Sequence, residues 1–469
     1  MGAKALAKRR GGQYNRATHS AGLGRGAPRG DRSNQPFGQV ECHRKEQAAA
    51  MNSRQRLQAT LDHRQPDRVC VDFGSTAVTG MHAAAVSRLR RAILGDTTFR
   101  VKVIEPYQML GEIDEALGQA LGIDVVGVLG RTTLFGFENA GWKPFDLFDG
   151  TPVLVPEQFN VTTEAGGDLL MHPEGDLSAP PSGRMPKGGW FFDSIVRQPP
   201  IDEGRLDPAD NLEEFAPFGD REIAYYRREA ERLDRSPDKG AILSMPGTAF
   251  GDIALVPAPW MKRPKGIRDV AEWYMSTALR RDYVYKVFEK QCEIALGNID
   301  VLAPLLGDRV QAVFLTGTDF GTQRGLFISP ASYRDLFKPF HAAVNERIHE
   351  KTTWKTFIHT CGSVADLMPD LIEAGFDILN PVQTSAAGMD PRRLKKDFGR
   401  QLVFWGGGAD TQHTMAFGTP EEVYSEVRER IGIFGDGGGF VFDSVHNIQA
   451  NTPTGNLLAM FKAIRDSAG

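Results

Sequence analysis

Three side chains in the C-terminal part of the sequence could bind one metal ion. His359 and Cys361 are two residues apart in the segment 355–362, and His446 follows much later in the chain. Side chains at positions i and i+2 at the end of a strand point to the same side, so an imidazole and a thiolate could hold one ion together. Three protein ligands leave a fourth tetrahedral position for substrate, which is typical of a catalytic zinc site. We therefore predict a metal site, in which His446 is also a candidate catalytic residue.

Further polar residues follow the apolar runs where strands of a parallel sheet would end. Thr318 and Asp319 follow one run, Asn380 and Gln383 another, and Asp410 a third. Asp319 could orient a ligating imidazole or act as a general base, although a turn acid bound to neighbouring amides has the same pattern. Asn380 and Gln383 both donate and accept hydrogen bonds, so they suit a substrate amide or carboxylate. Asp410 could bind a substrate nitrogen or cap the next helix. Thr318, Asn380, Gln383 and Asp410 form the predicted substrate pocket, and Asp319 is a candidate catalytic residue.

Eight short apolar runs, most of which end at a glycine or a polar residue, are predicted to be strands buried on both faces. They cover residues 69–73, 124–128, 241–245, 312–316, 356–359, 377–380, 402–405 and 439–442. From the fourth run onward they alternate with helical patterns over residues 329–351, 363–374, 391–398 and 420–433. Alternating strands and helices imply parallel strands, and eight such strands predict a (β/α)₈ TIM barrel with its site on the loops after the strands.

The ends of the predicted helices carry recognisable signals. Ser329 and Thr419 each precede a proline at the first helical position, and acidic residues follow Thr419. A capping hydroxyl before such a proline is typical of a helix start. Gly375 and Gly399 fall just past predicted helix ends, where glycine commonly terminates a helix.

The first fifty residues differ from the rest in charge. They hold ten Lys or Arg and three Asp or Glu, so their net charge is 10 − 3 = +7, and they contain few aliphatic residues. Such a segment is predicted to be disordered. It is either an Arg-rich targeting or binding tail or sequence upstream of a true start at Met51, where a helical pattern with an Asn or Ser cap begins. We prefer the second interpretation.

We predict that residues 51–469 form one folded unit. Within it, residues 149–198 lack a helical period and contain several turn signals, which predicts a hairpin-rich insertion after the second strand. The folded unit carries 55 − 10 = 45 basic and 59 − 3 = 56 acidic residues, which argues against a nucleic-acid surface. No apolar run is long enough for a membrane span. Four widely spaced cysteines favour a reducing, cytoplasmic location and leave Cys361 available as a thiolate.

Several segments together resemble the uroporphyrinogen decarboxylase (URO-D) superfamily. They are residues 357–364, 377–383, 388–391, 406–412 and 446–449. The opening segments 52–57 and 66–72 resemble the start of the methyltransferase-like branch of that superfamily. The resemblance extends from Met51 to the C-terminus and is most specific after residue 310. It implies a (β/α)₈ barrel, in agreement with the strand count.

The resemblance implies two activities that differ in their sites. Cobalamin-dependent methyltransferases of this fold hold zinc with a His-x-Cys pair, which His359 and Cys361 match, and a later Cys, where this chain has His446. The decarboxylase is metal-free and binds its acidic tetrapyrrole with an Arg-rich N-terminal motif, which residues 69–80 lack; a late His of the decarboxylase also falls near His446. We expect zinc-dependent methyl transfer between a small methylated substrate and a corrinoid or thiol acceptor. Any corrinoid would arrive on a partner protein or free. A metal-independent decarboxylase of a porphyrinogen-like acid and a non-catalytic corrinoid-binding barrel are the alternatives.

Overall fold

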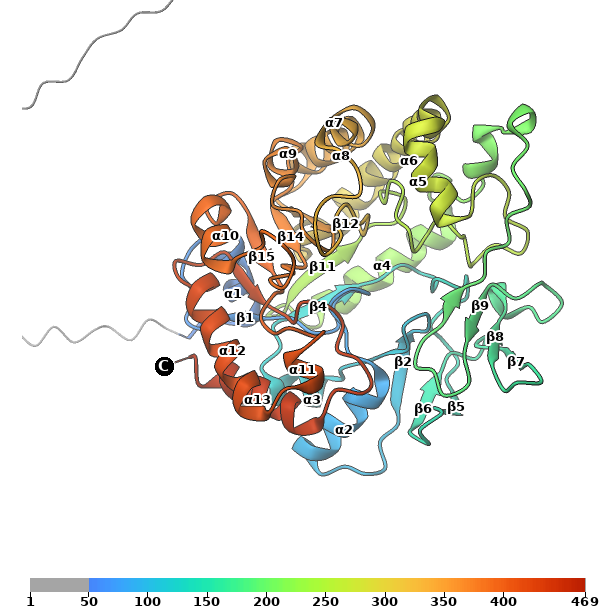
Figure 1. Ribbon diagram of the computed structural model, residues 1–469. Coiled ribbons are helices and arrows are strands. Elements are labelled where there is room, and N and C mark those ends of the chain that lie inside the picture. Colours follow the sequence, from blue (N-terminus) through green and yellow to red (C-terminus); the bar gives the residue numbers. More distant parts are fainter. Residues whose placement is uncertain (1–49, 469) are drawn as a thin grey trace, which may run out of the picture. The chain divides into compact units, whose positions relative to one another are not determined.

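Eight parallel strands form the central sheet of the computed structural model, which describes residues 50–468 (Figure 1). Their order is β1-β16-β15-β14-β13-β12-β11-β4. They are β1 (Cys70–Val71), β4 (Val125–Val128), β11 (Gly240–Ser244), β12 (Ala312–Thr316), β13 (Lys355–His359), β14 (Ile378–Asn380), β15 (Val403–Trp405) and β16 (Phe440–Phe442). The N–H of Asp124, just before β4, donates to the carbonyl of Val71 in β1 (2.8 Å), so the two ends of the sheet meet. Each strand overlaps one predicted run, and the predicted TIM barrel is confirmed. The predicted disordered head, apart from its last residue, lies outside the described residues.

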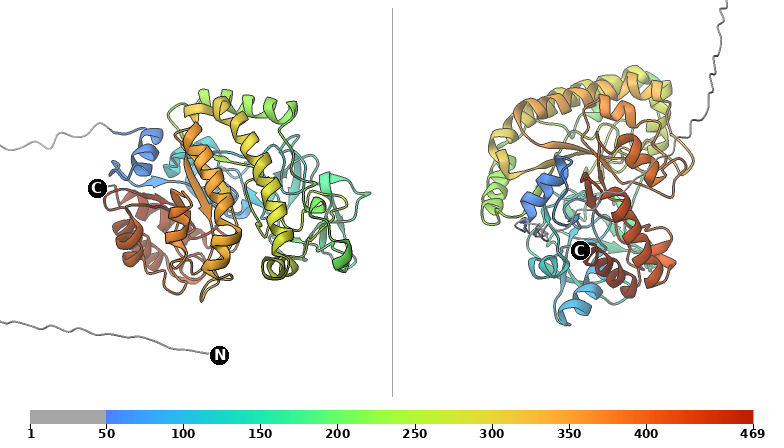
Figure 2. Two further views of the ribbon diagram at one scale, coloured as in Figure 1. Left: turned by 90° about the horizontal axis from the view of Figure 1, so that it is seen from above. Right: turned by 90° about the vertical axis from the view of Figure 1, so that its left-hand side faces the viewer.

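Helices surround the sheet, as Figures 1 and 2 show. The α-helices are α1 (Ser53–Leu61), α2 (Ala83–Leu94), α3 (Glu115–Leu121), α4 (Asp220–Asp234), α5 (Val270–Leu279), α6 (Arg281–Leu306), α7 (Pro330–Leu336), α8 (Lys338–Lys351), α9 (Met368–Glu373), α10 (Pro391–Phe398), α11 (Thr414–Phe417), α12 (Pro420–Phe434) and α13 (Thr454–Arg465). Short 3₁₀ helices cover Pro173–Gly175, Glu203–Arg205, Pro208–Asn211 and Gly307–Arg309. Among the described residues, no helix is both long and apolar enough to cross a membrane.

Two of the predicted helix boundaries need correction, whereas the two predicted helix-end glycines lie just past their helices. The helix expected over 329–351 is two helices that meet at Phe337. Pro339 has no backbone N–H to bond the carbonyl four residues earlier, so the hydrogen bonding of α7 does not continue into α8. The helix expected from 363 begins only at Met368, because the preceding residues form turns at the end of the barrel. Gly375 has the left-handed conformation of a helix terminator (φ +91°), whereas Gly399 ends α10 with an ordinary φ of −65°. Lys395 crowds the position that a Cβ on Gly399 would occupy.

The predicted helix starts are confirmed by their side-chain hydrogen bonds. Ser329 accepts from the backbone N–H of Ser332 (3.1 Å) at the start of α7. Thr419 and Glu422 form a reciprocal capping box at the start of α12, and Asn52 forms another with Gln55 at the start of α1. Each cap satisfies N–H groups that the first helical turn leaves free, and one such cap is typically worth about 1 kcal/mol.

The interior of the barrel is a hydrophobic cluster of its own, separate from the cluster between sheet and helices. Its strand residues are Cys70, Val125, Ile242, Ala312, Phe357, Ile378, Val403, Trp405 and Val441, which come from all eight strands. Leu57 and Leu61 of α1 join this cluster. Arg56 of α1 forms a salt bridge (2.6 Å) with Asp124, the residue directly before β4, and both side chains are buried. Helix α1 therefore closes the amino end of the barrel, which leaves the carboxyl end for a site.

The strands outside the barrel, of which β2 and β3 precede β4 and the others follow it, form two four-stranded sheets beside the barrel (Figure 1). The strands are β2 (Val101–Glu105), β3 (Leu110–Gly111), β5 (Lys143–Asp146), β6 (Pro152–Val155), β7 (Val161–Thr163), β8 (Leu169–Met171), β9 (Gly183–Met185) and β10 (Asp193–Ser194). Segment 149–198 contains β6 to β10, but β5 precedes it and pairs with β6. Strand β2, from the first βα unit, also pairs with β6. The insertion is therefore anchored to the loop region that follows β1.

Candidate metal centre

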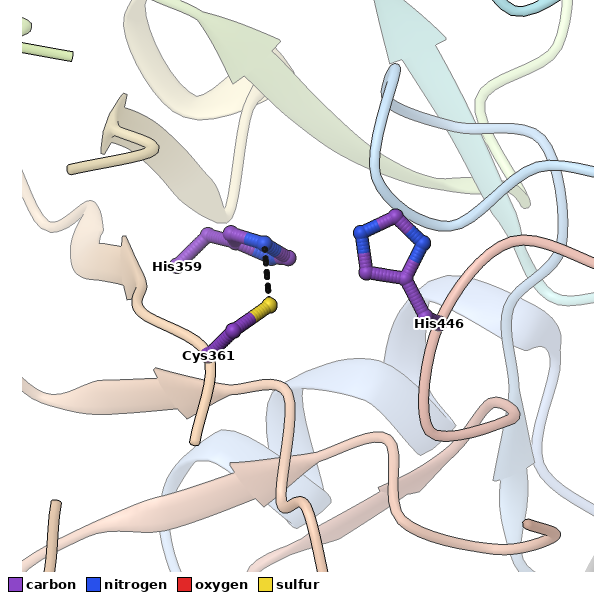
Figure 3. A group of neighbouring side chains, drawn as sticks. All are labelled: His359, Cys361 and His446. Atoms are coloured by element: carbon purple, nitrogen blue, oxygen red, sulfur yellow. Dashed lines mark hydrogen bonds between the residues drawn. The ribbon is translucent and has the colours of Figure 1, made fainter. Parts of the chain in front are cut away.

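His359, Cys361 and His446 lie together at the carboxyl end of the barrel (Figure 3). His359 is the last residue of β13, Cys361 follows it by two residues, and His446 is in the loop after β16. One nitrogen or sulfur atom from each residue lies within 4.8 Å of the other two. The sulfur of Cys361 is 3.4 Å from Nε2 of His359. The structure thus brings together the three side chains that the sequence proposed as ligands.

A hydrogen-bond relay fixes the orientation of the His359 ring. The amide of Asn380 donates through Nδ2 to the carbonyl of Trp405 (2.8 Å), so its Oδ1 faces Nδ1 of His359 at 2.5 Å. Because this oxygen can only accept, Nδ1 carries the proton and Nε2 presents a lone pair beside Cys361. Burial lowers the pKa of His359 to about 4, so the ring is neutral at pH 7. His359 is therefore oriented as a metal ligand by a residue outside the trio.

Cys361 is held by the backbone of its own loop. Its N–H donates to Asp319 (2.7 Å), and the N–H of Gly362 donates to Gln383 (2.8 Å). Gly362 has a φ of +88°, and a Cβ there would lie 2.5 Å from the carbonyl carbon of Gly321. Burial, and then the neighbouring Asp319, raise the pKa of the Cys361 thiol well above its usual value. Metal binding at Cys361 must therefore displace a proton.

His446 is oriented differently from His359. Its Nδ1 accepts a hydrogen bond from the backbone N–H of Asn447 (2.8 Å). A neutral imidazole that accepts at Nδ1 carries its proton on Nε2, the nitrogen that faces His359 and Cys361 in Figure 3. Burial, and then His359, lower the pKa of His446 to about 4. In this structure His446 therefore offers an N–H donor to the site.

Asp319 and Asp252 form a pair of carboxyl groups beside the trio. Asp319 is largely buried, and burial raises its pKa. Asp252 accepts from the backbone N–H groups of Gly317 (3.1 Å) and Ala254 (2.9 Å), and burial raises its pKa to about 6. Neither carboxylate has a salt bridge to Lys or Arg among the described residues. Asp252 was not among the predicted site residues, because it follows the third barrel strand and the polar residues that predicted the site follow the fourth to the eighth.

Asp72 and Asp443 form a second pair of buried acids, next to Trp405. Asp72, after β1, accepts from the indole N–H of Trp405 (3.0 Å) and from the hydroxyl of Ser75 (2.6 Å). Asp443 lies after β16, the neighbouring strand, and accepts from Ser444 (2.8 Å). Both acids are fully buried, and each has one oxygen without a hydrogen-bond partner in the described part of the chain. Burial raises the pKa of Asp72 to about 6, and burial and then the neighbouring Asp72 raise the pKa of Asp443 well above its usual value.

The side chains of the predicted substrate residues form hydrogen bonds within the protein. Asn380 uses both ends of its amide on His359 and Trp405, and Gln383 supports the loop of Cys361. The hydroxyl of Thr318 donates to the carbonyl of Phe250 (2.7 Å). Asp410 accepts from the backbone N–H groups of Gln412 (2.7 Å) and His413 (3.3 Å) in the turn before α11, so the predicted helix cap is wrong: the N-cap position of α11 is His413, and no side chain caps this helix. These contacts give the first three residues positioning roles that side-chain chemistry alone did not indicate.

The donor set suits a soft or borderline divalent metal such as zinc. A thiolate and an imidazole lone pair are ligands that zinc accepts, and tetrahedral bonds would place the ligand atoms roughly 3.3–3.8 Å apart. The separation of 3.4 Å between Cys361 and His359 falls in that range. His446 is the third candidate ligand, but its Nε2 would have to lose its proton to bind the ion. The carboxyl of Asp319, which has no salt bridge among the described residues, lies beside the trio and also favours a cation there.

Comparisons with known proteins found one matching family model and several similar solved structures. The model of the uroporphyrinogen decarboxylase (URO-D) family matches residues 268–467. A solved structure titled a methyltransferase from Methanosarcina mazei is 15% identical, covers 89% of this chain and 99% of its own, and has a TM-score of 0.48. A structure of morphinone reductase in complex with tetrahydroNAD is 11% identical, covers 72% of this chain and 89% of its own, and has a TM-score of 0.23. No curated protein matches the sequence. The segment that matches the URO-D family model, residues 268–467, carries all three members of the trio.

Proposed function

We propose that this protein is a zinc-dependent methyltransferase that moves a methyl group from a small methylated substrate to a corrinoid acceptor. The observation that carries the proposal is the pairing of His359 Nε2 with the sulfur of Cys361 at 3.4 Å, at the carboxyl end of a URO-D barrel. A zinc ion bound there would act as a Lewis acid on a donor atom of the substrate.

The surrounding residues have separate tasks in this proposal. Asn380 keeps the proton on Nδ1 of His359, which leaves Nε2 free for the metal. Asp319 accepts from the backbone N–H of Cys361 and lies beside its thiol, so it is a group that can take the thiol proton when His359 Nε2 binds the metal. Asp252 lies next to Asp319 and adds negative potential on that side. The site is thus prepared to release one proton and to gain one cation.

The methyl group would leave its substrate as a cation equivalent, so the substrate heteroatom keeps the electron pair of the broken bond. The corrinoid supplies the electron pair for the new bond. The described residues form one barrel with its insertion, and the corrinoid would come from outside this barrel, either on a partner protein or free. A thiol acceptor is less favoured, because the later cysteine of the methyltransferase branch is a histidine in this chain.

The charge of the barrel mouth weighs against the decarboxylase alternative. A porphyrinogen with several carboxylates needs basic partners, and arginines are the usual ones. The groups found here are instead four buried or largely buried acids, namely Asp72, Asp252, Asp319 and Asp443. Burial raises the pKa of each acid, and an anionic substrate beside them would add repulsion.

Metal content and methyl transfer test the proposal together. We expect purified protein to bind one zinc ion per chain, Cys361→Ser to lose it, and Cys292→Ser to keep it, because Cys292 lies in α6. We also expect cob(I)alamin to be methylated in the presence of a small O- or S-methyl donor, as followed by its visible spectrum. A wild-type protein without stoichiometric zinc would refute the zinc chemistry. Tight corrinoid binding without turnover in both wild type and Cys361→Ser would favour the non-catalytic alternative.

A further inference from the structure

The two histidines of the trio have different tautomers, and each directs its Nε2 into the space between the three side chains. His359 donates from Nδ1 to Asn380 and offers a lone pair at Nε2. His446 accepts at Nδ1 from the N–H of Asn447 and offers a proton at Nε2. A metal ligand must supply a lone pair, so one of these rings is prepared to bind an ion and the other is prepared to donate a hydrogen bond.

The backbone N–H of Asn447, which determines the tautomer of His446, is held in position by the side chain of Asn447. The Asn447 side chain accepts from the N–H of Gly80 (2.6 Å) and donates to the carbonyl of Ala77 and to Oε1 of Gln108, both at 2.8 Å. Asn447 is buried, with 1% of its surface exposed. Three hydrogen bonds to the loop after β1 and to the β2–β3 connection therefore fix the peptide before it. Breaking the bond to His446 would leave a buried N–H without a partner, which is unfavourable.

Direct coordination by His446 would therefore require a rearrangement. If Nε2 bound a metal, the neutral ring would carry its proton on Nδ1, which would then face the N–H of Asn447 donor to donor. Rotating the ring would avoid this clash, but it would take Nε2 away from the position that it has now. His359 requires no such change.

We propose that His446 is a hydrogen-bond donor to the substrate and not a resident ligand of the metal. This inference rests on the proposed function for the presence of the metal. The partner of Nε2–H would be the oxygen or sulfur atom of the substrate that keeps the electron pair when its methyl group leaves. Negative charge grows on that atom during transfer, so a donor fixed beside it stabilises the transition state more than the substrate. The metal would then be held by His359 and Cys361, and its other positions would be open to exchangeable groups.

Nitrogen-15 NMR of histidine-labelled protein tests the ring form directly. We expect His359 to carry its proton on Nδ1 and His446 to carry its proton on Nε2 in metal-free protein at pH 7, with signals assigned from His359→Gln and His446→Gln. After zinc is added, we expect the Nε2 signal of His359 to shift and His446 to keep its Nε2 proton. A His446 ring that is protonated on Nδ1 after zinc addition would overturn the proposal.

Zinc affinity, measured by competition with a chromophoric chelator, tests the same inference with zinc alone as the probe. We expect His359→Gln and Cys361→Ser to weaken binding at least 100-fold and His446→Gln to weaken it less than 3-fold. The control His349→Gln changes a histidine near the opposite end of the barrel, where it pairs with Asp377 before β14, and should bind zinc as the wild type does. Equal losses for His446→Gln and His359→Gln would overturn the inference. If the wild type bound no zinc, the proposed function would fail, whereas the NMR result on metal-free protein would still decide the role of Nε2–H.

Discussion

Replacing Asn380 with alanine removes the group that orients His359. The substitution leaves two buried groups without partners, namely the Nδ1–H of His359 and the carbonyl of Trp405. Asn380 and Trp405 have no exposed surface and His359 has 4%. A buried polar group that loses its partner costs about 1–3 kcal/mol, so we expect Asn380→Ala to lower the free energy of unfolding by about 2–6 kcal/mol.

The same substitution should weaken metal binding. Without Asn380, the proton of His359 is free to move to Nε2, and the lone pair no longer faces Cys361. Loss of such an outer partner typically costs 10–100-fold in metal affinity, which corresponds to about 1.4–2.7 kcal/mol. The assay is a zinc competition titration at pH 7, combined with urea unfolding followed by tryptophan fluorescence.

A second buried asparagine provides a matched control. Asn345 in α8 has 1% of its surface exposed and donates to the carbonyl of Ala374 (2.6 Å), which lies outside the site. Asn345→Ala should therefore lower stability by about 1–3 kcal/mol and leave zinc affinity unchanged. The reasoning is wrong if Asn380→Ala binds zinc within twofold of the wild type, or if both substitutions weaken zinc binding equally.

Three further predictions concern stability. The pKa of Asp72 is raised from 3.8 to about 6, so its stabilising contribution is complete below about pH 4 and is lost as the pH rises through 6. Asp72→Asn keeps an acceptor for Trp405 and removes this loss, so at pH 8 it should be more stable than the wild type by about 3 kcal/mol, with little difference at pH 4; equal urea midpoints at pH 8 would contradict this. Leu57→Ala should cost about 2–5 kcal/mol by opening a cavity at the amino end of the barrel, whereas Leu458→Ala, at a site 38% exposed, should cost much less in the same urea titration. Gly362→Ala should lower the thermal midpoint and weaken zinc binding, because its Cβ would meet the backbone of Gly321; wild-type values for both would refute this.

The sequence predicted the barrel because its signals are local. Apolar runs of strand length mark strands buried on both faces, and the caps at Ser329 and Thr419 mark helix starts through contacts within four residues. The order of strands and helices then limits the topology to parallel neighbours. The break at Phe337 was missed because Pro339 is compatible with the start of a new helix as well as with a bend.

The sequence by itself also determined the trio, because His359 and Cys361 have the spacing of a ligand pair and His446 follows the last strand of the same barrel. Only the tertiary structure decided what each nitrogen presents to the site. The ring form of a histidine depends on which group touches its other nitrogen, and those groups are Asn380 for His359 and the peptide of Asn447 for His446. Asn380 is the last residue of β14, whereas the histidine it orients ends β13, and Asn447 is fixed by residues more than 300 positions away in the chain. Such long-range contacts leave no signal in residue spacing. Only the folded barrel therefore determines which histidine presents a lone pair to the site and which presents an N–H.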